Sequence, residues 1–371
     1  MLKYLKLIKA KYIFKAPPKN FYLIYDNASS YLCSLLKKNS YTIFFNRFEE
    51  INFYILFKCF FLYRGNSLSK RYALTYIRYV EPKIIISAVD NNLSFYKLYK
   101  YFKKIKIITV QNGIRSFQND FKINKNLSNL KKMNLKCDYF FVLSEKYKKI
   151  YSKFIKSKYI VSGSIKSNKY KISTRHYNRI VFISQFSNNK KLFKTTFIEA
   201  DKIAFTQTLN FCDKKNYKLY LLLKYGSKKE INFFKSLNKN NSKNLVFVSN
   251  ETIKEKFRYL DNSNLIVAVD STLGYEMIAR KKKVFLISIR DQYLKNNEKR
   301  NIQFTDKNSS FKNEGFFWIN NYLKKRKNLI FKKMDLLYNL PTKKINKFYN
   351  KYKQSLLIYD FKNTKIKRIL R

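Results

Sequence analysis

The stretch LIVAVDSTLGYEMIARKKKVFLI, residues 265–287, decides the fold that this chain is predicted to adopt. An apolar run ends at Asp270, small polar residues follow, a helical pattern begins, and a second apolar run starts at Val284. Strand, short turn, helix and strand in this order form the repeating unit of a parallel sheet. The turn would present backbone N–H groups and hydroxyls at a helix N-terminus, where a phosphate binds readily.

Two interpretations of this turn are open on its residues alone. In the first, Ser271, Thr272 and Gly274 hold the phosphate of a nucleotide. Glu276 cannot favour a phosphate, because it is itself negative, so its natural partner is a sugar diol. In the second, Ser271 or Thr272 is an ordinary N-cap and Glu276 is solvated.

Apolar, β-rich runs alternate with helical patterns on both sides of this stretch. We expect a first series of strands at 21–25, 41–45, 83–89, 105–110, 139–143 and 158–161, and a second at 180–184, 218–223, 245–248, 265–269 and 284–287. Helices are expected at 28–38, 51–63 (buried), 68–80, 93–102, from 145, at 197–212 and 252–259, and from 341 to about 357, with a polar loop at 116–132.

This alternation predicts an α/β protein with two Rossmann-like domains, each built on a parallel sheet covered on both faces. A polar stretch from Gly163 to Asn178 is the predicted boundary. The expected domains are therefore a first Rossmann-like domain at 1–165, a second at 176–340 and a helical tail at 341–371.

The composition is strongly basic, with 79 Lys and Arg against 23 Asp and Glu, a formal net charge of +56. Such a charge favours an anionic partner: nucleic acid, anionic lipid headgroups or a phosphorylated substrate. AT-rich codon usage would enrich Lys, Asn, Ile, Phe and Tyr in the same way, so charge alone assigns no function. Aromatic residues are spread along the chain rather than confined to one basic strand face, which disfavours nucleic acid.

Several classes of chemistry are disfavoured by what the sequence lacks. His176 is the only histidine, and no Asp-x-Asp pair occurs, so no metal site is expected. The four cysteines are far apart, which indicates a reducing compartment and a cytoplasmic protein. No secretory signal is recognisable, and the longest apolar run, 51–63, is interrupted by Lys58 and too short to span a bilayer.

Ligands of open parallel sheets bind beyond the carboxyl ends of the strands, so the polar residues there are the candidates for a site. In the first half they are Asp26, Asp90, Gln111, Asn112, Gly113 and Arg115, and in the second half Ser184, Gln185, Lys224, Ser271, Thr272, Gly274 and Glu276.

These strand ends also carry a family resemblance. VDNNLSFYKL (89–98), VQNGIR (110–115), VSGSIKSN (161–168), FISQF (182–186) and VDSTLGYEMIARKKKV (269–284) resemble motifs of the bacterial surface carbohydrate biosynthesis family. That family is related to capsule-polysaccharide transferases and has a GT-B glycosyltransferase-like fold, which implies that the parallel sheets of the two Rossmann-like domains face each other across a cleft. The matches keep their order over residues 20–290.

The resemblance implies that the second domain binds a nucleotide-sugar through Ser184, Gln185, Lys224, Ser271, Thr272 and Gly274, with Glu276 on the ribose or the sugar. It also implies that the first domain is the acceptor side, where Gln111, Asn112, Gly113 and Arg115 would position the substrate. Two departures are notable. Relatives often carry Lys-x-His-Pro where this chain has Lys224-Tyr-Gly, and Gln-His-Gly where it has Gln-Asn112-Gly.

The resulting hypothesis is a glycosyltransferase of capsule or lipopolysaccharide biosynthesis, which transfers a sugar to a glycan or lipid-linked acceptor without metal or cofactor. Asp90 is the first candidate for the general base and Asp26 the second, although Asp90 could instead be the N-cap of the helix near Leu93. A phosphopolyol transferase, a nucleotide-sugar epimerase and a basic RNA- or membrane-surface-binding protein are the alternatives. Peripheral contact with the anionic inner face of the plasma membrane is a further expectation.

Overall fold

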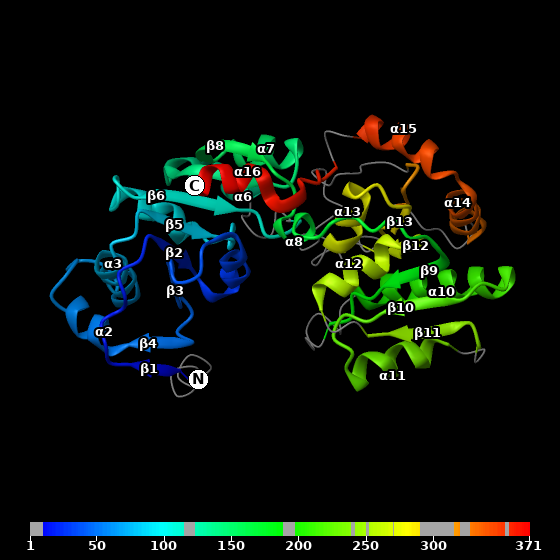
Figure 1. Ribbon diagram of the computed structural model, residues 1–371, viewed down its shortest axis with the longest axis horizontal. Helices are drawn as coiled ribbons and strands as arrows, with labels where there is room; N and C mark the ends of the chain where they lie inside the picture. Colours follow the sequence, from blue (N-terminus) through cyan, green and yellow to red (C-terminus); the bar gives the residue numbers. More distant parts are fainter. Residues whose placement is uncertain are drawn as a thin grey trace.

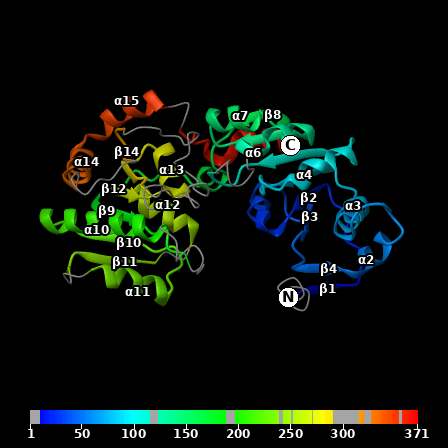
Figure 2. The same cartoon turned by 180° about the vertical axis from the view of Figure 1, so that it is seen from behind.

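The computed structural model describes residues 10–114, 123–187, 197–238, 242–249, 252–269, 271–289, 315–319, 327–352 and 356–371. Two six-stranded sheets form two domains that lie side by side (Figure 1). The view from behind shows the same two bodies (Figure 2). The predicted α/β fold with two parallel sheets is therefore confirmed.

All strands of the first sheet are parallel, in the order β3-β2-β5-β6-β7-β8. They are β2 (Tyr22–Tyr25), β3 (Tyr41–Phe44), β5 (Ile84–Ser87), β6 (Lys106–Val110), β7 (Leu135–Val142) and β8 (Ile155–Val161). The chain passes from β2 to β3 on one side and then to β5 on the other. The carboxyl ends of β2 and β5 therefore form a topological switch point, where ligands of such sheets bind.

The second sheet has the order β11-β10-β9-β12-β13-β14, the classical Rossmann order. Its parallel strands are β9 (Tyr177–Ile183), β10 (Leu219–Leu222), β11 (Leu245–Val248), β12 (Ser263–Ala268), β13 (Val284–Ile287) and β14 (Trp318–Ile319). Strands β12 and β13 are buried throughout. Continuous apolar strands of this kind are typical of a sheet covered on both faces. Here the switch point lies between β9 and β12.

Helices and a small two-stranded sheet complete the domains. The first domain holds β1 (Lys11–Ile13) paired with β4 (Glu50–Asn52), the 3-10 helices η1 (Asn27–Leu35) and η2 (Lys97–Lys100), and helices α2 (Phe53–Cys59), α3 (Leu68–Val80), α4 (Leu93–Tyr96), α6 (Ile123–Lys132) and α7 (Glu145–Tyr151). The second holds α10 (Phe197–Lys215), α11 (Lys228–Leu237), α12 (Ile253–Asp261), α13 (Thr272–Ala279), α14 (Lys327–Asn339) and α15 (Thr342–Tyr352). None of the helices that the structure describes is both long enough and apolar enough to cross a membrane.

The structure corrects three expectations about these elements. The predicted polar loop at 116–132 ends in helix α6, and Leu127 and Leu130 of that helix pack against the core. The apolar run at 51–63 is not a buried helix, because α2 spans only seven residues and exposes Phe57 and other aromatic rings. Strands β1, β4 and β14 were not expected.

The last residues of the chain return to the first domain. The 3-10 helix η6 (Phe361–Asn363) and helix α16 (Thr364–Leu370) lie beside β8 and the short helix α8 (Ile165–Asn168) in Figure 1. Asn363 Nδ2 donates to the carbonyl of Ile165 at 3.1 Å, and Lys365 Nζ donates to the carbonyl of Val161 at 2.7 Å. Ile366 and Leu370 are buried in the same apolar cluster as Ile24 of β2. The tail therefore completes the first domain.

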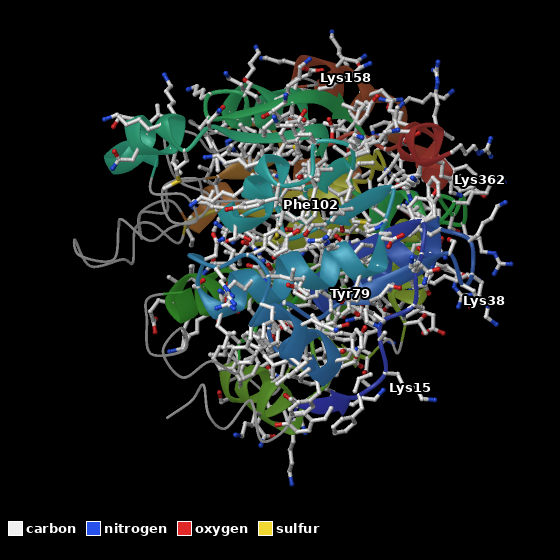
Figure 3. The ribbon with its side chains drawn as sticks, turned by 90° about the vertical axis from the view of Figure 1, so that its left-hand side faces the viewer. Lys15, Lys38, Tyr79, Phe102, Lys158 and Lys362 are labelled. Atoms are coloured by element: carbon white, nitrogen blue, oxygen red, sulfur yellow. The ribbon has the colours of Figure 1, made fainter. Side chains whose placement is uncertain are left out.

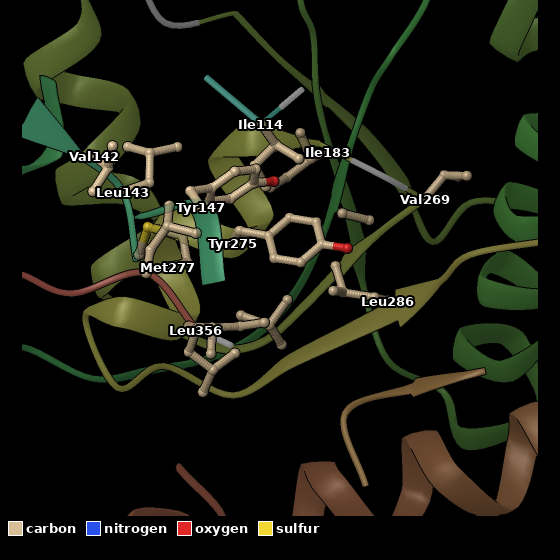
Figure 4. Close-up of a cluster of buried hydrophobic side chains, with 14 of the residues drawn as sticks. Ile114, Val142, Leu143, Tyr147, Ile183, Val269, Tyr275, Met277, Leu286 and Leu356 are labelled. Carbon is tan, nitrogen blue, oxygen red and sulfur yellow. The ribbon is translucent and has the colours of Figure 1, made fainter. Parts of the chain in front are cut away.

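An apolar cluster joins the two domains. Figure 4 shows rings and aliphatic side chains of both domains in one group: Ile114, Val142, Leu143 and Tyr147 from the first, Ile183, Val269, Tyr275, Met277 and Leu286 from the second, and Leu356 from the tail. All ten side chains are buried. Burial of apolar surface therefore holds the domains together directly beside their facing strand ends.

Candidate functional site

The loop after β6 meets the start of α13 across the domain boundary. A Cβ at Gly113 would lie 3.4 Å from Oγ1 of Thr272. Gly113 belongs to the predicted Gln-Asn-Gly loop and Thr272 to the predicted phosphate turn. The structure thus brings these two predicted parts of the site together.

Two residues of the turn have structural contacts of their own. Ser271 is the N-cap of α13, and its hydroxyl accepts a hydrogen bond from the N–H of Leu273 at 3.2 Å. A Cβ at Gly274 would lie 3.1 Å from Cβ of Ala268 and 3.2 Å from Cδ2 of Leu286. The glycine therefore allows α13 to lie close against its sheet. The Thr272 hydroxyl is the turn's contact with the opposite domain, and Asp270 lies outside the described residues.

Glu276 is buried at the domain boundary, with 5% of its surface exposed. The hydroxyl of Ser164, the N-cap of α8, donates a hydrogen bond to its Oε1. Burial raises the pKa of Glu276 to about 7, although the Ser164 hydrogen bond and the charges of Lys166 and Arg280 act in the opposite direction. The alternative of a solvated Glu276 is therefore wrong.

Lys166 connects this carboxyl with the first domain. Its Nζ donates to Oδ1 of Asn112 at 3.1 Å and lies 4.7 Å from the centre of the Tyr31 ring. Tyr31 also donates its hydroxyl to Oδ1 of Asn112, at 3.1 Å. Our sequence reasoning did not select Lys166. Its position in the SGSIKSN motif, three residues after Gly163, could have identified it, because the chain has only 6 glycines.

Asp90 lies on the other side of the same loop and is fully buried. Its Oδ1 accepts from the N–H of Asn112 at 3.3 Å, and the hydroxyl of Tyr151 donates to its Oδ2. The N-cap of α4 is Asn92, which accepts from the N–H of Ser94 at 3.1 Å. The alternative in which Asp90 caps this helix is therefore wrong, and its carboxylate instead holds the Gln-Asn-Gly loop.

Gln111 fastens the loop to the neighbouring strand. Its Oε1 accepts from the N–H of Leu143 at 3.1 Å, and its Nε2 donates to the carbonyl of Gly113 at 2.9 Å. Both the oxygen and the nitrogen of the Gln111 amide are therefore hydrogen-bonded within the first domain. Arg115, the last predicted residue of this loop, lies outside the described residues.

Asp26, at the carboxyl end of β2, adopts an unusual backbone conformation with φ of 81°. Its Oδ1 accepts from the N–H of Ala28 at 2.9 Å and caps η1, while its Oδ2 lies 3.1 Å from Nε of Arg47. A non-glycine residue at positive φ is uncommon, and such residues cluster at functional sites. Asp26 is only 1% exposed. In this conformation its carboxylate caps η1 and pairs with Arg47.

The second domain holds a buried carboxylate that sequence reasoning missed. Glu230, at the start of α11, is fully buried and accepts from the backbone N–H groups of Lys224 (2.8 Å), Tyr225 (2.8 Å) and Gly226 (3.1 Å). The hydroxyl of Ser184 also donates to it. These three consecutive N–H groups form an anion-binding nest that the protein fills with its own carboxylate.

Glu230 could have been found from the pattern Ser-Lys-Lys-Glu at 227–230, which is typical of a helix start. The other predicted residues nearby remain at the surface or beside it. The side chain of Lys224 is exposed, with Nζ 4.8 Å from the Tyr225 ring centre, and Gln185 is half-buried.

A buried ion pair anchors α13 to the chain that links the domains. The guanidinium of Arg280 forms two bonds to Asp261, at 2.9 and 2.5 Å, and donates to the carbonyls of Ser167 and Tyr170, each at 3.0 Å. Both charged side chains are almost completely buried. This contact fixes the helix that carries Glu276 against the segment that carries Ser164.

Within the described residues, no group of three His, Cys, Asp or Glu side chains is arranged to hold a metal ion. The site is instead a polar network of neutral and charged side chains. Hydrogen bonds link Tyr151, Asp90, Asn112 and Lys166 in sequence, and the charge of Lys166 acts on Glu276, which itself accepts a hydrogen bond from Ser164 across the domain boundary.

Two Rossmann-type sheets whose strand-end loops meet across a domain boundary define a protein with the GT-B fold. A family model described as "putative O-antigen biosynthesis protein" matches residues 108–371. The chain belongs to this family of surface carbohydrate biosynthesis proteins. No protein of curated function matches the chain by sequence.

Solved structures resemble the whole chain in fold. A UDP-GlcNAc 2-epimerase from Neisseria meningitidis has a TM-score of 0.52 at 12% identity, covering 95% of this chain and 99% of its own. The epimerase from Methanocaldococcus jannaschii has 0.51 at 13%, covering 94% and 98%. A variant of the wall teichoic acid polymerase TagF has 0.51 at 12%, covering 95% and 89%. At such identities the likeness shows the fold alone.

Proposed function

We propose that this protein is an enzyme that transfers a sugar from a nucleotide-sugar donor to a hydroxyl of a glycan or lipid-linked acceptor. The observation that carries the proposal is the polar network that crosses the domain boundary where the strand ends meet. It joins Asp90 and Asn112 of the first domain to Lys166 and Glu276. Membership of an O-antigen biosynthesis family supports a carbohydrate substrate.

The donor would bind at the start of α13. The N–H groups of the first turn and the Thr272 hydroxyl suit the phosphates of the donor. Lys166 lies between Asn112 and Glu276 and would place a cation beside the leaving phosphate, which gains charge as the glycosidic bond breaks. This arrangement stabilises the leaving group without a metal. Glu276 would then face the ribose or the sugar after release from Ser164.

Asp90 has two candidate roles that make different predictions. As the general base it would accept the proton of the acceptor hydroxyl, and Asp90→Asn would abolish turnover at every pH. As a positioning residue it would hold Asn112 and the loop, and Asp90→Asn would mainly raise KM. Its bonds to Tyr151 and to the backbone of Asn112 support the positioning role. Asp26 is the second candidate for the base, at the neighbouring strand end.

The first test is a thermal-shift screen of the full chain with CMP-, UDP- and GDP-sugars, followed by a turnover assay with the donor that raises Tm. Lys166→Met should lower donor affinity at least tenfold, whereas Lys38→Met, an exposed lysine of the first domain, should leave it unchanged. No shift with any nucleotide-sugar would refute the proposal. Equal affinity of the two variants would refute the role of Lys166.

Two other reactions differ from sugar transfer, one in its need for an acceptor and the other in its donor. The fold likeness to UDP-GlcNAc 2-epimerases favours an epimerase as the second candidate, and this reaction would proceed on a nucleotide-sugar alone. The likeness to a wall teichoic acid polymerase favours a phosphopolyol transferase, which would be stabilised by a cytidine diphosphate polyol instead of a sugar nucleotide. Release of nucleotide from a nucleotide-sugar, and only when a glycan acceptor is added, would support sugar transfer over both: dependence on the acceptor excludes the epimerase, and the sugar donor excludes the phosphopolyol transferase.

A further inference from the structure

Five aromatic side chains at one end of the first domain form a surface that the proposed reaction does not use. We call them the aromatic row: Tyr12 and Phe14 of β1 and the residue after it, Phe53 and Phe57 of α2, and Phe61 just beyond α2. The exposed fractions are 72% for Phe14, 62% for Phe57 and 59% for Phe61. Contiguous apolar surface of this kind marks an interaction site on a soluble domain.

Ring contacts join the members of the row in two groups. The ring of Phe53 lies 5.1 Å from that of Phe14, stacked at 7°, and 5.3 Å from that of Tyr12. The rings of Phe57 and Phe61 lie 5.5 Å apart. Because Phe53, Phe57 and Phe61 are spaced by four residues, they follow one side of the helix and its extension.

The opposite side of α2 supplies the packing that the domain needs. Ile55 and Cys59 are fully buried there, and α2 packs on α3. A surface helix normally turns polar residues outward, whereas α2 turns phenylalanines outward. Burial of Ile55 and Cys59 therefore accounts for the fold of α2, and the exposed rings are left without a structural role.

The surroundings of the row are cationic. Residues 10–20 and 52–71, which carry it, contain seven basic residues and no acidic one: Lys11, Lys15, Lys19, Lys58, Arg64, Lys70 and Arg71. Lys11 and Lys19 form exposed ion pairs with Glu50 and Glu81, and the other five have no acidic partner among the described residues. Figure 3 shows this side of the molecule, with Lys15 and Lys38 extending outward.

We propose that the aromatic row and its basic rim bind the surface of a membrane that contains anionic lipids. Phenylalanine rings would enter the boundary between headgroups and acyl chains, and the lysines and arginines would contact the anionic headgroups. Aromatic residues beside cations, with no acidic residue in the same segments, match this partner in both polarity and charge. The row lies away from α8 and α13 in Figures 1 and 2, so the membrane contact is distinct from the donor site.

The test is sedimentation of the full chain with vesicles of phosphatidylcholine alone or mixed with phosphatidylglycerol. The wild type should bind the anionic vesicles, and binding should weaken in high salt. Phe57→Ser with Phe61→Ser should lower the partition coefficient at least tenfold. Leu336→Ser, which removes a side chain 52% exposed on α14 of the other domain, is the matched control and should not change it.

A tryptophan reporter shows whether the row itself enters the lipid. The chain has one tryptophan, the buried Trp318, so wild-type emission should not respond to vesicles. In Phe57→Trp, emission should shift to the blue and be quenched by brominated lipid. Absence of binding to anionic vesicles, or equal binding by the double serine variant, would overturn the proposal. A dimer in solution that the double variant dissolves would overturn it too, by assigning the row to a second copy of the chain.

Discussion

Glu276→Gln tests whether the carboxyl at the domain boundary is buried as tightly as the structure indicates. The pKa of Glu276 is raised from 4.5 to about 7, first by burial. The folded protein therefore binds this proton more tightly than the unfolded chain. This tighter proton binding contributes to the free energy of unfolding. The contribution is fully present below about pH 4.5 and is lost as the pH rises through 7, a total loss of about 3 kcal/mol.

Glutamine keeps an oxygen for the Ser164 hydroxyl and carries no charge at any pH. The free energy of unfolding of Glu276→Gln should therefore rise relative to wild type by about 2 kcal/mol between about pH 5.5 and about pH 8. Urea unfolding followed by the fluorescence of Trp318 reports on the domain that holds Glu276. Glu145→Gln, at an exposed helix start, controls for the loss of one negative charge. If the free energies of unfolding of wild type and Glu276→Gln differ by the same amount at both pH values, the reasoning is refuted.

Three further substitutions test the framework around the site, each by urea unfolding. Arg280→Met leaves the buried Asp261 unpaired and should cost about 3–5 kcal/mol; a loss under about 1 kcal/mol would contradict this. Gly274→Ala places a Cβ 3.1 Å from that of Ala268, so it should destabilise by about 1–3 kcal/mol although alanine favours helices, and a gain would count against close packing. Glu230→Gln turns an amide NH₂ toward backbone N–H donors and should cost about 2 kcal/mol, whereas an unchanged midpoint would exclude the nest.

Most strands were predictable because the sheets are parallel and covered on both faces. Runs such as Val284–Ile287 are apolar at every position, and the observed bounds of β11 and β13 agree with the expected ones. Helix α6 was missed because its sequence, INKNLSNLKK, is mostly polar and only the core contacts of Leu127 and Leu130 identify its buried side. Strand β14, of two residues, has too little sequence to form a pattern.

The residues of the candidate site were easier to predict than their partners. Asp90, Asn112 and Glu276 stand at strand ends or one turn beyond, where sheet topology places ligands. Ser164, the partner of Glu276, is 112 residues away in the sequence. No local pattern connects two such positions, because their contact depends on how the two domains pack against each other. The nest around Glu230 was missed for another reason. The pattern Ser-Lys-Lys-Glu indicates a helix start, but the donors to Glu230 are backbone N–H groups, which residue identity does not reveal.

The return of the chain to its first domain has a mechanical consequence. The polypeptide crosses between the domains twice: residues 163–177 lead from the first domain to β9 of the second, and after α15 of the second domain the chain is back at the first, where the N–H of Ile358 donates to the carbonyl of Leu143 at 3.3 Å. Two chain connections that lie close together limit how the domains can move relative to each other more than a single connection would. Because the buried apolar cluster of Figure 4 lies at the same boundary, any opening of the site would also have to separate these side chains.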